Sequence, residues 1–146
     1  MTDSRAMTAL PTMTRLSSYE PFPYSIDSVE LTFELNPTKT LVTQVARYIR
    51  IEKDARSIEL NGKNLKRISI CIDGIEVDEE RVLEIDEMLL IRQVPSKFTL
   101  KIVTEINPEA NTALEGLYLS NGMFCTQCEA EGFRRITYYP DRPDVM

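Results

Sequence analysis

The densest group of chemically useful side chains lies between residues 125 and 129. Cys125-Thr126-Gln127-Cys128-Glu129 combines two thiols, an amide and a carboxylate within five residues. Residues two apart in a strand face the same side, so a strand over 125–129 predicts that Gln127 and Glu129 share one face. An amide oxygen and a carboxylate that converge in this way can accept hydrogen bonds from an ammonium group. Taken alone, the pattern also fits a solvated strand face.

The two thiols raise a zinc or redox interpretation. A structural zinc site usually needs four Cys or His ligands, whereas Cys71 is the only other cysteine and the chain has no His. A thioredoxin-like dithiol opens a helix in a βαβ unit, and the chain shows no pattern of that kind. We therefore expect ordinary buried or half-buried thiols and no metal site in this chain, with a dithiol redox protein as a remaining alternative.

Composition narrows the function classes further. The 146 residues suit one domain. A net charge of −6 with dispersed Lys and Arg argues against a phosphate-binding surface, so we expect no nucleic acid partner. No apolar run reaches the roughly 18 residues of a membrane span, and residues 1–18 lack the apolar core of a secretory signal. Three cysteines fit a reducing compartment, and we expect a cytoplasmic location.

The rest of the sequence shows the hydrophobic patterns of strands, which would position the side chains of 125–129. Short runs of alternating or apolar residues recur along the chain, at 29–35, 40–51, 65–72, 82–85, 88–91, 98–104 and 125–129. The first two should pair as a hairpin around Asn36-Pro37, and Ile68, Ile70 and Ile72 should share one face. The segment 79–88 fits either a helical turn or strands, and 130–136 fits one helical turn. We therefore predict an all-β fold, an antiparallel sandwich or saddle.

The domain organisation is simple. Residues 1–18 are rich in Ser, Thr and Met, lack periodicity and are expected to form a flexible leader. Residues 19–146 are expected to form the β domain. The leader also contains Arg5 and Arg15 and few acids, so a transit peptide and an organellar location form the alternative to a plain tail.

A longer stretch of sequence carries a family resemblance. Asn111-Thr112-Ala113-Leu114-Glu115-Gly116-Leu117-Tyr118, taken with the nearly ungapped run from Cys125 to Val145, closely resembles the N-terminal domain of zinc-dependent aminopeptidases of the alanyl aminopeptidase (aminopeptidase N) family. The resemblance is sharp over 98–146, looser over 19–98 and does not cover 1–18. The family's zinc helix, H-E-x-x-H with a distal Glu, and its G-x-M-E-N loop do not occur here. We therefore expect a partial domain, incomplete at its C-terminal end.

The resemblance implies a function for a longer parent protein. Such a parent binds one zinc ion and removes single N-terminal residues from peptides, favouring small or basic ones, with the zinc as Lewis acid and a glutamate as general base. The family residues that match Gln127 and Glu129 bind the α-ammonium of the substrate, together with the Glu of the distant G-x-M-E-N loop. This chain would supply that ammonium-binding strand, contain no catalytic residue and pack on a catalytic domain that it lacks.

Two expectations complete this interpretation. Glu115, Glu131 and Asp141 lie in equally matching stretches, and we expect structural roles for them, with the charges of Asp141-Arg142-Pro143 pairing locally in a turn. The chain alone should be inactive and bind no zinc, because it lacks a complete ligand set. The alternative from another class is a stand-alone, non-catalytic β-sandwich interaction module.

Overall fold

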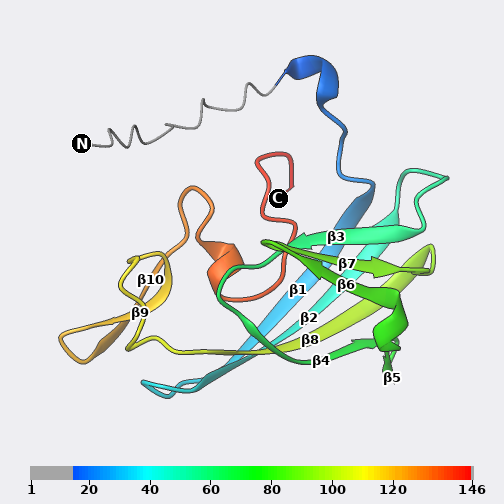
Figure 1. Cartoon of the computed structure of the whole chain (residues 1–146). Helices are drawn as coiled ribbons and strands as arrows, with labels where there is room; N and C mark the ends of the chain where they lie inside the picture. The colour runs from blue at the N-terminus through cyan, green and yellow to red at the C-terminus, as the bar shows by residue number, and fades with distance from the viewer. Residues whose placement is uncertain (1–14, 146) are drawn as a thin grey trace, which may run out of the picture.

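The computed structural model describes residues 15–145, and strands dominate it (Figure 1). The helical elements of these residues are single turns of 3-10 helix at Leu16–Ser18 (η1), Glu79–Arg81 (η2) and Phe133–Arg135 (η3). None of them is long and apolar enough to cross a membrane. The strands are β1 (Tyr24–Glu34), β2 (Thr40–Arg50), β3 (Ser57–Asn61), β4 (Lys66–Ile72), β5 (Ile75–Glu76), β6 (Val82–Ile85), β7 (Met88–Arg92), β8 (Lys97–Ile106), β9 (Gly116–Ser120) and β10 (Met123–Gln127). The predicted all-β class is confirmed.

A five-stranded sheet, here called the large sheet, forms the base of the fold. Its strands follow the order β1-β2-β8-β4-β5, and each neighbouring pair is antiparallel. The predicted hairpin of β1 and β2 is present, with Phe33 opposite Val42. Alternation along β2 buries Val42, Ala46 and Tyr48, because every second residue faces the interior. Strand β8 continues the same inner face through Leu100 and Ile102.

A three-stranded sheet, the small sheet, supplies the other half of the main core. Its order is β3-β7-β6, also antiparallel, and Ile58 and Ile91 lie opposite each other at full burial. Aromatic rings from the large sheet fill the core: the Tyr48 and Phe98 rings are stacked with centroids 5.4 Å apart. Because β9 and β10 pair only with each other, they form a separate two-stranded hairpin beside the two sheets (Figure 1).

A second, smaller cluster of buried hydrophobic side chains holds the β9–β10 hairpin against the large sheet. Leu117 of β9 packs with Val42 of β2, Ile106 of β8 and Ile136, and Phe124 and Phe133 lie against them half-buried. Isolated two-stranded hairpins are marginal in water. The β9–β10 hairpin is therefore held by its contacts with the end of the large sheet and with the residues that follow β10.

Several local predictions can be compared with this structure. The segment 79–88 resolves into η2 followed by β6, and 130–136 contains the predicted single helical turn, η3. Ile70 and Ile72 are buried, but Ile68 is 48% exposed. The pairing of β4 with β8 shifts register between Arg67 and Ser69, which interrupts the alternation at Ile68. The expectation of one face for all three isoleucines was therefore wrong at Ile68.

The two ends of the described part of the chain are joined by hydrogen bonds that involve side chains. Most of the predicted leader, residues 1–18, lies outside the described residues. Residues 15–18 are described, and they form the single turn η1 with Arg15 before it. Just after it, the Tyr19 hydroxyl donates to Asp144 Oδ2 at 2.8 Å, and the Phe22 N–H donates to the same oxygen at 3.3 Å. Arg142 Nη2 donates to the Glu20 carbonyl at 2.6 Å. Residues 19–22 therefore lie against residues 142–144.

Candidate functional site

The predicted binding residues lie at the end of β10 and just beyond it. Gln127 is the last residue of β10 and pairs with Gly116 of β9. Glu129 falls in the turn that follows, whose Glu129–Ala130 peptide is cis, and both side chains are exposed. The predicted strand over 125–129 was therefore two residues too long. The shared-face argument does not extend to Glu129, because the turn and not the strand sets its direction.

Two glycines shape this turn. Gly132 closes it, and its N–H donates to the Cys128 carbonyl at 3.0 Å. A Cβ at Gly132 would collide with the Gln127 carbonyl oxygen and lie 2.9 Å from the Cα of Cys128. Gly116 has φ +74°, and a Cβ there would lie 2.7 Å from the Cβ of Arg135. The backbone around Gln127 and Glu129 is therefore packed to a closeness that only glycine allows at these positions.

The residues after β10, 128–145, begin with this turn and are here called the return segment. They run from the hairpin back across the inner face of the large sheet toward β3 (Figure 1). Buried polar side chains of the large sheet hold them. Gln44 Nε2 donates to Thr137 Oγ1 at 2.9 Å and to the Tyr138 carbonyl at 2.8 Å. The Thr104 hydroxyl donates to the Ile136 carbonyl at 3.1 Å. Because Gln44, Thr104 and Thr137 are all fully buried, these bonds fix the segment's position.

Strand β3 and the loop after it anchor the same segment from the other side. Asn61 and Tyr139 exchange two backbone hydrogen bonds, at 2.8 and 3.1 Å, and Asn61 Oδ1 accepts from the Asp141 N–H at 3.1 Å. The Lys63 N–H donates to the Arg134 carbonyl at 2.8 Å. The return segment is therefore bound to both sheets.

Ion pairs add to this framework. Arg134 Nε lies 3.1 Å from Asp141 Oδ2, and Arg134 Nη2 lies 3.4 Å from Glu131 Oε2. Arg135 Nε lies 3.0 Å from Glu115 Oε2. The structural roles expected for Glu115, Glu131 and Asp141 agree with these contacts. The expected local pairing holds for Arg142, which pairs with Asp144 at 2.8 Å, but not for Asp141, which pairs with Arg134 seven residues away.

The surroundings of the cysteines bear on the dithiol alternative. Cys71, Cys125 and Cys128 are all free thiols of intermediate exposure. Burial, and secondarily the nearby charge of Asp141, raises the pKa of the Cys128 thiol. A reactive dithiol needs a thiol whose pKa is lowered. The environment of Cys128 therefore argues against the dithiol alternative.

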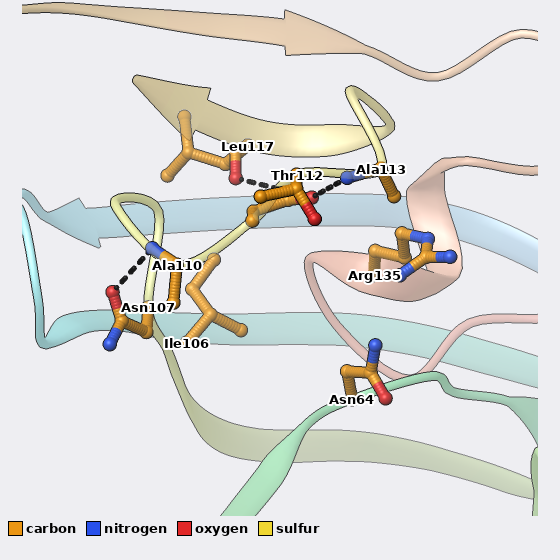
Figure 2. A pocket seen from close by; sticks show the side chains of 9 residues that line it. Asn64, Ile106, Asn107, Ala110, Thr112, Ala113, Leu117 and Arg135 are labelled. Atoms are coloured by element: carbon orange, nitrogen blue, oxygen red, sulfur yellow. Dashed lines mark hydrogen bonds between the residues drawn. The ribbon is translucent and has the colours of Figure 1, made fainter.

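A cavity of about 280 Å³ lies next to the hairpin (Figure 2). Asn111 spans one of its walls: its Nδ2 donates to the Leu117 carbonyl at 2.9 Å, and its Oδ1 accepts from the Ala113 N–H at 3.1 Å. Arg135 also lines this cavity, but Gln127 and Glu129 do not. The two predicted binding residues therefore face solvent rather than this hollow.

The described residues do not fit a metal site. Within 15–145, no group of three or more His, Cys, Asp or Glu is placed so that it could hold a metal ion. The carboxylates nearest to Glu129 in sequence, Glu131 and Asp141, are both engaged by Arg134. Carboxylates engaged by an arginine are poor ligands for a zinc ion, so we assign no zinc ligand here.

Sequence reasoning missed the residues that hold the site in place. Gln44 lies in register with Val42 and Ala46 on the inner face of β2. A polar residue on an otherwise apolar face was the available signal. Gly132 had no signal beyond its residue type, because its close approach to Gln127 depends on the tertiary path of the return segment.

Known proteins resemble this chain over most of its length. The peptidase M1 N-terminal domain family matches residues 18–146. Aminopeptidase N of Caulobacter vibrioides is 45% identical over 139 residues, which cover 95% of this chain and 16% of the relative. Aminopeptidase A of Legionella pneumophila, solved in complex with aspartic acid, superimposes with a TM-score of 0.80 at 26% identity and covers 90% of this chain and 16% of that one.

A more distant structure shares the fold alone. The M1 zinc metallopeptidase of Deinococcus radiodurans superimposes with a TM-score of 0.68 at 14% identity, over 84% of this chain and 30% of that one. The chain thus spans only a small part of these proteins, 16% of the length of its curated relatives.

Proposed function

Because the chain belongs to the peptidase M1 N-terminal domain family, we propose that it is the N-terminal β domain of a zinc-dependent aminopeptidase. The parent enzyme would remove single residues from the N-terminus of peptides. The identity to aminopeptidase N, 45% over 95% of this chain, supports this assignment. We also propose a cytoplasmic parent. The alternative of an organellar one rests on residues 1–18, of which 1–14 lie outside the described residues.

Within that parent, Gln127 and Glu129 would accept hydrogen bonds from the substrate's α-ammonium group. This group has a pKa of about 7.7–8.0 and is largely protonated at neutral pH. A carboxylate binds it by a charge-assisted hydrogen bond, and an amide oxygen accepts a further N–H hydrogen bond. The observation that supports this role is the end of β10 with the turn after it, where an exposed amide and an exposed carboxylate lie two residues apart on a backbone that packs closely against Gly116 and Gly132.

The rest of the parent would complete this site. Both side chains are open to solvent in the described residues, where an ion pair contributes little. An ammonium contact strengthens when a second surface covers it and excludes water. We therefore propose that the exposed side of the turn faces the catalytic part of the parent, and that peptide enters between them.

The zinc would be held outside the described residues, which do not fit it. When bound, it supplies a Lewis acid and an activated water to the hydrolysis. The contribution of this chain would be to place the N-terminus, and with it the first peptide bond. We accordingly propose that the chain alone does not hydrolyse aminoacyl substrates.

The test replaces Glu129 in the full-length parent. Glu129→Ala removes one charged contact to the ammonium, a loss of about 1.5–3 kcal/mol. This corresponds to a fall in kcat/KM of about tenfold to a hundredfold on alanyl peptides. Gln127→Ala removes a neutral hydrogen bond and should cost less, about 0.5–1.5 kcal/mol.

A neighbouring acid provides the matched control. Glu131 lies in the same turn, is exposed and carries the same charge, but its carboxylate is directed to Arg134. Glu131→Gln should leave kcat/KM within about twofold, because surface pairs of this kind contribute little. Equal losses at Glu129 and Glu131 would reduce the effect to local charge, and full activity of folded Glu129→Ala would favour the non-catalytic module instead.

A further inference from the structure

The ion pair between Arg134 and Asp141 differs from the other ion pairs of the described residues. Its side chains are each 14% exposed, whereas every other pair in 15–145 has a partner that is at least 34% exposed. Asp141 Oδ2 accepts both the backbone N–H of Arg134, at 3.2 Å, and its Nε–H, at 3.1 Å. Arg134 Nη2 also donates to the Asp141 carbonyl at 2.9 Å. Buried pairs with several bonds are screened least by solvent and salt.

This pair connects the turn that carries Glu129 to the small sheet. On one side, Arg134 follows Gly132, the last residue of the turn, by two residues, and its backbone N–H is held by Asp141 Oδ2 at 3.2 Å. On the other side, the Asp141 N–H donates to Asn61 Oδ1, and the Arg134 carbonyl accepts from the Lys63 N–H. The turn therefore has two supports, the β9–β10 hairpin at Gln127 and the Arg134–Asp141 pair at its far end.

We propose that Arg134 and Asp141 are positioning residues for the ammonium-binding turn. The proposal rests on the function proposed above for Glu129. A binding carboxylate must be held within about 0.5 Å of its productive position, and packing and hydrogen bonds of supporting residues provide that precision. Neither residue touches the substrate in this account; both act by fixing the path of 129–132.

Asp141→Asn in the full-length parent tests the proposal. The amide keeps the shape of the side chain and one acceptor oxygen but removes the charge that Arg134 binds. We expect kcat/KM on an alanyl peptide to fall about tenfold in otherwise native enzyme, and by less than about twofold when Glu129 is already Gln, because the two residues act on one contact. A fall of equal size in both backgrounds would overturn the proposal and assign Asp141 a general structural role.

Asp144 provides the matched control. It is an aspartate of the same segment, and its Oδ1 lies 2.8 Å from Arg142 Nε, but its other contacts are to Tyr19 and Phe22 rather than to the turn. Asp144→Asn should leave kcat/KM within about twofold. If Asp141→Asn proves insoluble, Arg134→Lys replaces it as the test. Lysine keeps the positive charge but cannot bond both the Asp141 carboxylate and the Asp141 carbonyl as the guanidinium does, so kcat/KM should fall by a smaller factor, about threefold.

Amide hydrogen exchange separates this proposal from the one on which it rests. In the 146-residue chain, Asp141→Asn should speed exchange of the amides of 129–132 while the amides of β2 and β8 keep their protection. Unchanged exchange at 129–132 would overturn the positioning role, whatever the kinetics. If Glu129→Gln leaves kcat/KM unchanged, the assignment of Glu129 fails, and hydrogen exchange still decides whether Asp141 orders the turn.

Discussion

The interior between the two sheets and the return segment are held in different ways. The interior consists of apolar and aromatic side chains such as Ile58, Tyr48 and Leu100, all fully buried. The return segment contributes Ile136 and Tyr138 to the hydrophobic clusters, but it is also attached through the polar side chains of Gln44, Thr104 and Asn61. Apolar contacts have no preferred direction, whereas hydrogen bonds do. The first region therefore provides stability, and the second provides the position of the turn.

This difference explains where the candidate site lies. Gln127 and Glu129 sit at the junction of the marginal hairpin and the return segment, outside both sheets. Binding residues are often carried on such connections and positioned by a rigid scaffold. Substitutions in the interior should change stability without changing the site. Substitutions of Gln44, Thr104 or Asn61, the polar side chains that attach the return segment, should change both.

The largest effect on stability should come from the interior. Leu100→Ala deletes a fully buried side chain of β8 and leaves a cavity, at a cost of about 2–5 kcal/mol in the free energy of unfolding. Urea denaturation of the 146-residue chain measures this value. Ile75→Ala is the control, because Ile75 is 74% exposed and its loss should change stability by less than about 0.5 kcal/mol.

Replacing a buried polar side chain that holds the return segment should have a smaller effect on stability and a larger one on the turn. Gln44→Met keeps the volume of the side chain but removes both donors, so Thr137 and the Tyr138 carbonyl lose a partner. The same change removes the unpaired buried Gln44 Oε1, which offsets part of the loss. We expect a net cost of about 1–2 kcal/mol. Amide exchange at 129–138 should become faster as well. A variant that loses stability while exchange at 129–138 stays unchanged would contradict the claim that polar side chains position the turn.

Alkaline pH should weaken both regions. Burial is the main cause that raises the pKa of Tyr138 in the return segment to about 12, and it also raises the pKa of Tyr48 in the interior. Because the folded pKa lies above the unfolded value of about 10, the stability from each group is complete below pH 10 and is lost as pH rises through the folded value.

Removing one hydroxyl tests this dependence. Tyr138→Phe should make the decline in stability between pH 10 and 12 shallower than in the native chain. Denaturant midpoints of both proteins at pH 10, 11 and 12 give the two slopes. Parallel slopes would show that Tyr138 titrates alike in the folded and unfolded chain, contrary to its burial.

The sequence predicted the regular parts of the fold and missed the long-range ones. Alternation of apolar residues located β1, β2 and β8, and the hairpin of β1 with β2 followed from the turn at Asn36-Pro37. The end of β10 was missed because the turn that ends it depends on the close approach of Gly132 to Gln127 and Cys128 and, across the hairpin, to Gly116, which residue types alone do not reveal. Likewise the residues that hold Asp141 lie at Arg134 and Asn61, and no local rule selects them over the adjacent Arg142.

The candidate site residues came from the family resemblance, whereas their geometry did not follow from the sequence. The resemblance to the aminopeptidase N family singled out Gln127 and Glu129, and the match to the peptidase M1 N-terminal domain family covers both residues. The shared strand face that was expected for them fails at Glu129, since that residue follows the strand. Their role in binding stays a proposal of this account.

The most direct test of that role compares two ligands that differ only in the α-ammonium group. Alanine hydroxamate and its des-amino analogue, propionohydroxamate, would be titrated as inhibitors of the full-length parent and of its Glu129→Gln variant. The account predicts that the native enzyme prefers the amine and that the preference falls about tenfold or more in the variant, with the affinity for the des-amino ligand nearly unchanged. An undiminished preference in the folded variant would contradict the account and place ammonium recognition elsewhere.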